Sequence, residues 1–88
     1  MMKYSVNPVC TVANLGEETV ILNAESGVYF SLNEVGGFLW ERMSEQPRGF
    51  EDLVSSVVAE YDTDADTCRN DIREIVDQLS REKLIIAE

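Results

Sequence analysis

The fold of this chain is decided by residues 27–35, whose sequence is GVYFSLNEV. Apolar positions alternate with mixed ones: Val28, Phe30 and Leu32 are interleaved with Tyr29 and Ser31. Because successive side chains of a β-strand point to opposite faces, this alternation predicts a strand with one apolar face. The sequence around this strand is strand-like on its N-terminal side and helical on its C-terminal side.

A helix is predicted to begin directly after this strand. Asn33 stands where an N-cap residue belongs, and Glu34 places negative charge in the first turn, where the helix dipole favours it. An apolar stripe extends the helix to about Met43. The pair Gly36-Gly37 costs about 1 kcal/mol per residue relative to alanine inside a helix, which predicts close packing of this turn against another element.

The chain before residue 27 is predicted to form strands. Residues from Lys3 to Leu15 are rich in β-branched side chains, and Pro8 within them marks an edge or the start of pairing. A turn is predicted at Gly16-Glu17-Glu18. The next strand, Thr19–Asn23, is separated by a few turn residues from Val28–Leu32, so the two strands are expected to pair as an antiparallel hairpin.

Two more helices follow the first. An apolar pattern without a miss predicts a helix from Phe50 to Tyr61, and an amphipathic one predicts a longer helix from about Ala65 to Glu82. Residues 84–86 are expected to close the chain as a short strand or extended tail. The predicted fold class is therefore α+β and winged helix-turn-helix-like, with an N-terminal three-stranded antiparallel sheet followed by three helices, in a single domain over residues 1–88.

Composition excludes several classes of function. The 88 residues carry 17 acidic and 7 basic side chains, a formal net charge of −10, which works against binding nucleic acid. The two cysteines, Cys10 and Cys68, have no metal spacing and are read as reduced residues of the core of a cytoplasmic protein. We find neither a signal peptide nor an apolar run near the roughly 20 residues of a membrane span.

The sequence also lacks the residues and motifs that would indicate catalysis. The chain has no histidine, so there is no imidazole base, no histidine-based triad and no histidine-containing zinc site. The run Asp62-x-Asp64-x-Asp66 has Thr67 where a calcium loop needs glycine and Arg73 where it needs glutamate. We therefore expect no enzyme, no cofactor and no metal site, and a binding module is the default.

The predicted sheet offers a partner an exposed edge. An unpaired edge next to a helix can accept an added peptide strand, and here Val28–Leu32 would present the edge while the third helix forms the opposite wall of a groove. The alternative is that the large apolar residues of both segments are simply core, since small domains bury most of them. Tyr29 lies on the face opposite Phe30 and is the better candidate for partner contact.

The sequence as a whole resembles the PqqD family. The resemblance covers about residues 8 to 87, and its most specific element is Leu32-Asn33 followed by Gly36 and Trp40. It implies a recognition element that binds the leader segment of a ribosomally made precursor peptide and presents it to a modifying enzyme, either a radical S-adenosylmethionine enzyme or a leader peptidase or cyclase. The peptide-binding residues it implies here are Val28, Tyr29, Phe30, Ser31, Leu32, Ile72, Ile75, Val76 and Leu79.

Two other functions remain open from the sequence. A docking or regulatory subunit of a biosynthetic enzyme would use the acidic surface of the third helix. A winged-helix DNA-binding regulator would share the fold but needs basic residues on its recognition helix, where acidic residues here outnumber Arg69, Arg73 and Arg81. Either a monomer or a dimer is compatible with a small domain that has exposed strand edges.

Overall fold

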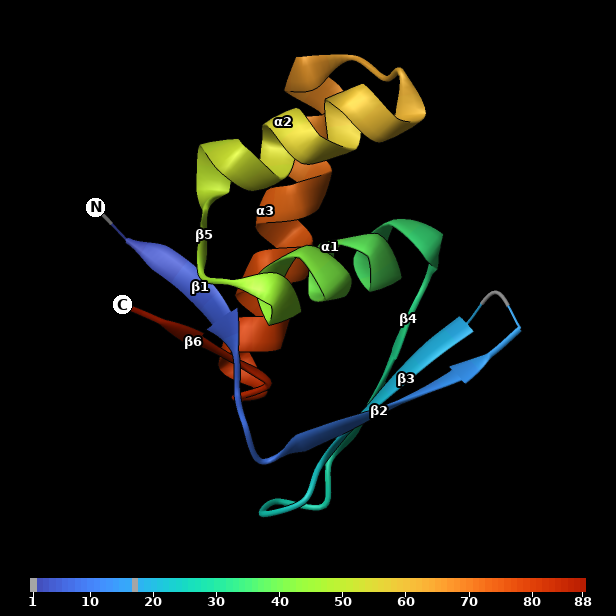
Figure 1. Ribbon diagram of the computed structural model, residues 1–88, viewed down its shortest axis with the longest axis vertical. Coiled ribbons are helices and arrows are strands. Elements are labelled where there is room, and N and C mark those ends of the chain that lie inside the picture. Colours follow the sequence, from blue (N-terminus) through green and yellow to red (C-terminus); the bar gives the residue numbers. More distant parts are fainter. Residues whose placement is uncertain (1, 17) are drawn as a thin grey trace.

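The computed structural model describes residues 2–16 and 18–88. Over these residues three helices pack against two small antiparallel sheets (Figure 1), which confirms the α+β class. The helices are α1 (Glu34–Glu45), α2 (Phe50–Tyr61) and α3 (Ala65–Arg81). The strands are β1 (Lys3–Val6), β2 (Cys10–Leu15), β3 (Glu18–Asn23), β4 (Tyr29–Leu32), β5 (Arg48–Gly49) and β6 (Ile85–Ala87).

The first sheet has the order β2-β3-β4, and the predicted hairpin of β3 and β4 is confirmed, with Thr19 opposite Leu32 and Leu22 opposite Tyr29. In the middle of β3, Ile21 is fully buried and pairs with Phe30. The predicted turn before β3 includes Glu17, which lies outside the described residues. The sheet therefore presents one face to the helices and ends at β4 on one side and β2 on the other.

The second sheet, of order β5-β1-β6, differs from the prediction. The segment from Lys3 to Leu15 is two strands rather than one, and the first of them, β1, lies outside the predicted sheet and pairs with β5 and β6. The break falls at Pro8, beside which the Asn7 side chain accepts a hydrogen bond from Val9 N and donates one to Lys83 O. Figure 1 accordingly places β1 and β6, the first and last strands, side by side.

Helix α1 begins as the sequence predicts. The Asn33 side chain accepts a hydrogen bond from Gly36 N at 2.8 Å, so it caps one of the free amides of the first turn. The helix runs to Glu45, slightly beyond the expected end at Met43, while α3 ends at Arg81 rather than Glu82. The N-cap fixes the direction in which the chain leaves β4 and so places α1 across the sheet.

The two glycines of α1 lie where the helix approaches the sheet, as predicted. A Cβ atom on Gly36 would lie 3.1 Å from Leu32 Cβ, and one on Gly37 would lie 2.7 Å from Thr19 Oγ1. The second distance is shorter than any ordinary carbon–oxygen contact. Only glycine leaves room for α1 to pack directly on β3 and β4. The lower helix propensity of the two glycines is the cost of this close contact.

This contact predicts a coupling between Gly37 and Thr19. In Gly37→Ala the clash costs about 1–3 kcal/mol, which the gain in helix propensity of about 1 kcal/mol only partly offsets. In a Thr19→Ala background the clashing oxygen is gone, so the same change should stabilise the domain. A double-mutant cycle of urea unfolding should give a coupling of at least about 1 kcal/mol. Additive effects of the two substitutions would contradict this packing.

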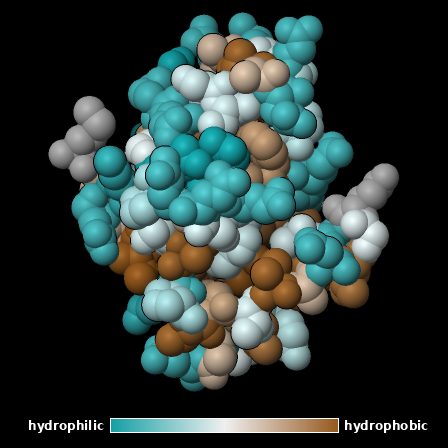
Figure 2. Space-filling model, viewed as in Figure 1, coloured by the Kyte–Doolittle hydropathy of each residue, from teal (hydrophilic) through white to brown (hydrophobic). Residues whose placement is uncertain are grey.

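The core lies between the helices and the inner face of the first sheet. Its fully buried large side chains come from β3, all three helices and the segment before β6: Ile21, Leu39, Met43, Leu53, Ile72, Leu79 and Leu84. Cys68 is buried among them as predicted, whereas Cys10 is half-buried at the edge of the core. In Figure 2 the upper, helical part of the visible face is mostly hydrophilic, and hydrophobic atoms gather below it. No helix in the described segments is long and apolar enough to cross a bilayer.

Candidate functional site

Strand β4 is an edge of the first sheet, because β3 covers only one of its sides. The turn before it is held by Asn23, whose buried side chain accepts hydrogen bonds from Glu25 N and Ser26 N and donates one to Lys83 O. Gly27 follows with φ of 74°, a left-handed conformation that glycine adopts without steric cost. Asn23 therefore anchors the start of β4 to the C-terminal part of the chain.

The hydrogen-bond pattern defines which groups of β4 face outward. Asn23 N donates to Val28 O at 3.0 Å, so these opposite residues form a hydrogen-bonded pair. In an antiparallel ladder such pairs alternate with non-bonded ones, which directs the backbone groups of Phe30 toward β3. The N–H and C=O groups of Tyr29 and Ser31 consequently point away from the sheet. They form a short template for an additional strand.

One flank of α3 lies beside the end of this edge. A groove of about 360 Å³ there is lined by Asn33 and Val35 from the start of α1 and by Asp71, Glu74, Ile75 and Gln78 from α3. Val35 and Ile75 are half-buried against the core and form its apolar part. The carboxylates of Asp71 and Glu74 give the groove an acidic wall. A second hollow, lined by Ser31 and Asn33 among others, adjoins the same end of β4.

The structure separates the nine predicted peptide-binding residues into two groups. Four lie in the core and expose at most 4% of their surface: Leu32, Ile72, Val76 and Leu79. These four side chains belong to the core cluster against which Val35 and Ile75 pack, and contact with a partner would require them to leave the core. The other five reach the surface at least in part: Val28, Tyr29, Phe30, Ser31 and Ile75. Among them Tyr29 is 71% exposed, as the alternation predicts.

Five residues that line the groove are absent from the predicted set: Asn33, Val35, Asp71, Glu74 and Gln78. Once Ile75 is assigned to the surface, helical spacing points to Asp71 and Gln78, which lie four residues before it and three after it. The sequence gives no sign of which flank of α3 faces β4, because that depends on how the helix packs on the sheet.

The family model described as "Coenzyme PQQ synthesis protein D (PqqD)" matches residues 18–85, which include β3, β4 and all three helices. The chain belongs to the PqqD family. The resemblance that residues 32–40 suggested is thereby confirmed, and the PqqD match contains both the β4 edge and the flank of α3 beside it. A comparison with curated proteins finds no match.

Two solved structures share this PqqD fold over nearly their whole length. One is titled "TbiB1 in Complex with the TbiA(beta) Leader Peptide"; it has a TM-score of 0.81 and 28% identity, and the match covers 92% of this chain and 93% of that one. The other is "Lasso peptide synthetase B1 complexed with the leader peptide", with a TM-score of 0.79, 22% identity, and 94% and 96% coverage. The second likeness concerns the fold alone. Both solved structures are complexes with a leader peptide.

Proposed function

We propose that this chain binds the leader segment of a ribosomally made precursor peptide by adding it as a strand to β4. The observation that carries this proposal is the open edge at Tyr29 and Ser31 beside the groove of α3. Membership of the PqqD family and the likeness to TbiB1, whose structure holds a leader peptide, support it. The bound leader would then be presented to a modifying enzyme, in a non-catalytic role.

Backbone pairing supplies the sequence-independent part of the binding. Tyr29 and Ser31 together offer outward N–H and C=O groups, and each hydrogen bond formed contributes a net of about 0.5–1.5 kcal/mol. This is too little for specific recognition, so side chains must add to it. Val35 and Ile75 would take an apolar side chain of the leader, while Asp71 and Glu74 disfavour acidic leader residues at that point.

The same proposal includes a description of the fold, a partner enzyme, an oligomeric state and a set of binding residues. The arrangement of α2 and α3 beside a small sheet is consistent with the winged helix-turn-helix-like description. The partner enzyme, whether a radical S-adenosylmethionine enzyme or a leader peptidase or cyclase, stays a prediction of the family resemblance. A monomer and a dimer are both compatible with this fold. Of the nine predicted binding residues, the proposal keeps as direct contacts the five that reach the surface, Val28, Tyr29, Phe30, Ser31 and Ile75.

Truncation of Ile75 tests the side-chain part of the proposal. Ile75→Ala should weaken binding of a leader peptide, taken from a precursor encoded beside this chain, by about tenfold, because it removes apolar surface from the groove. Val58→Ala on α2 is the matched control, since Val58 is also half-buried against the core but does not line this groove. Isothermal titration calorimetry of both variants measures the effect. Equal affinities for the two variants would remove Ile75 from the site.

A further inference from the structure

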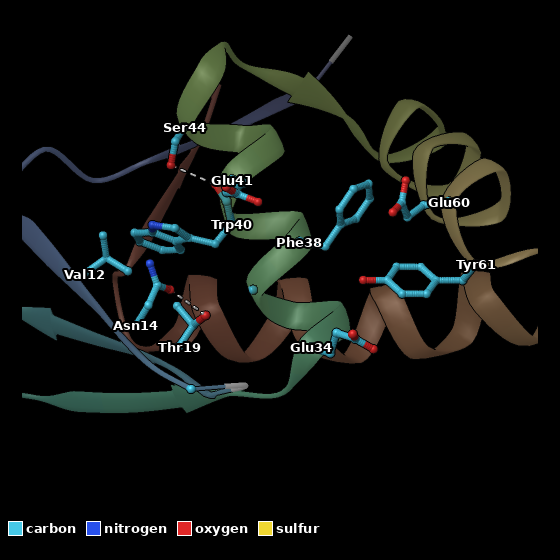
Figure 3. Close-up of a pocket in the computed structure, with 12 residues that line it drawn as sticks. Val12, Asn14, Thr19, Glu34, Phe38, Trp40, Glu41, Ser44, Glu60 and Tyr61 are labelled. Carbon is cyan, nitrogen blue, oxygen red and sulfur yellow. Dashed lines mark hydrogen bonds between the residues drawn. The ribbon is translucent and has the colours of Figure 1, made fainter.

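A larger pocket lies on another face of α1, between this helix, the β2–β3 hairpin and α2 (Figure 3). It measures about 680 Å³, and none of its lining residues belongs to β4. Along α1 its lining residues recur at helical spacing, from Glu34 through Phe38 to Glu41. Val35 and the groove of α3 lie on a different face of the helix. Glu34 also lines the hollow at the end of β4, so the two surfaces meet at this residue.

The walls of this pocket are aromatic. Phe38 and Tyr61 meet edge to face, with ring centroids 5.6 Å apart and an interplanar angle of 88°. Both rings are half-buried, and Trp40 extends the aromatic wall toward β2, with its indole directed at Val12 and Asn14 in Figure 3. Aromatic rings carry negative charge on their faces, and that charge attracts cations.

The rim of the pocket is acidic and has no compensating cation. Glu34, Glu41 and Glu60 are exposed, line the pocket and take part in none of the ion pairs among the described residues. None of the seven basic residues lines the pocket either. All three carboxylates act on Tyr61, which lines the pocket. Burial raises the pKa of Tyr61, and the negative charges of Glu34, Glu60 and Glu41 raise it further.

We propose that this pocket receives an arginine side chain from the surface of a protein partner. A guanidinium group stacks on aromatic rings and forms paired hydrogen bonds with carboxylates, so it matches both the walls and the rim. The net charge of −10 favours approach of a basic surface. The chain would then have two contact surfaces that adjoin at Glu34, one for a peptide strand at β4 and one for the partner protein at α1 and α2.

The direct test uses the peptide acetyl-Gly-Arg-Gly-amide and its neutral counterpart with citrulline in place of arginine. In a ¹⁵N-HSQC titration of the full chain up to about 10 mM, we expect the arginine peptide to shift Gly37, Phe38, Tyr61 and the Trp40 indole N–H. We expect the citrulline peptide to bind at least about fivefold more weakly. Equal shifts with both peptides, or arginine-dependent shifts confined to residues outside the pocket, would overturn the proposal.

Charge-matched variants then separate the pocket from the overall charge. The triple variant Glu34→Gln, Glu41→Gln, Glu60→Gln should lose at least about tenfold in affinity for the arginine peptide. The control Glu25→Gln, Glu82→Gln, Glu88→Gln removes the same net charge from residues outside the pocket and should lose less than about twofold. All six side chains avoid the core, so both variants should fold, which circular dichroism checks. An equal loss in the two variants would mean general attraction and overturn the proposal.

Discussion

Ser31→Pro is expected to reduce the affinity for a leader peptide by at least about 30-fold while leaving the domain folded. The amide of Ser31 points away from β3, so proline removes a donor that only the incoming strand would use. Its ring also occupies the space where that strand must approach. The loss of one hydrogen bond together with this clash accounts for roughly 2 kcal/mol or more.

Three companion variants isolate the cause of this effect. Ser31→Ala should bind normally, because only the side chain changes. Phe30→Pro removes an amide that faces β3 and should unfold the hairpin instead of merely weakening binding. Val12→Pro places the same change on the opposite edge of the sheet, where β2 has its outward backbone groups. If Val12→Pro weakened leader binding as much as Ser31→Pro, β4 could not be the site.

Ile72→Ala is expected to lower the free energy of unfolding by about 2–5 kcal/mol, because Ile72 is fully buried and its truncation leaves a cavity in the core. For a domain of this size, that corresponds to a fall in Tm of at least about 8 °C. Differential scanning calorimetry measures it. At a temperature where the variant is still folded, its affinity for the leader should change by less than about threefold.

This result bears on an expectation from the sequence, which placed Ile72 among the peptide-binding residues. A variant with normal stability and lost affinity would mean that Ile72 touches the peptide directly, contrary to its burial. Ile75→Ala provides the contrast three residues along the same helix. There the effect on affinity should exceed the effect on stability, because the Ile75 side chain is only half-buried and lines the groove.

Local signals in the sequence were sufficient for most of the fold. The alternation in residues 28–32, the N-cap Asn33 and the apolar periodicity of α2 each depend on neighbours within a few residues, and each is confirmed. The second sheet could not be predicted in this way. Its β1 strand pairs with β6 at the far end of the chain, and β5 is a two-residue strand within an expected loop.

Of the candidate site, the β4 edge was predictable from the sequence, whereas the flank of α3 that faces the groove was not. Strand alternation identified the β4 edge, and antiparallel pairing with β3 followed from the short turn. Periodicity also found the apolar stripe of α3, but it does not distinguish the residues at the centre of the stripe from those at its margin. Ile72 is central and buried, whereas Ile75 is marginal and reaches the groove. The acidic residues beside Ile75 became part of the site only through the packing of α3.

Amide hydrogen exchange of the ¹⁵N-labelled chain, measured residue by residue with and without a leader peptide, tests strand addition at β4 most directly. We predict that the leader slows exchange of the Tyr29 and Ser31 amides at least about tenfold, since these two face the open edge. The outward amides of Val12 and Asn14 on β2 should exchange at the same rate as before. Binding that leaves Tyr29 and Ser31 unprotected would contradict strand addition at β4.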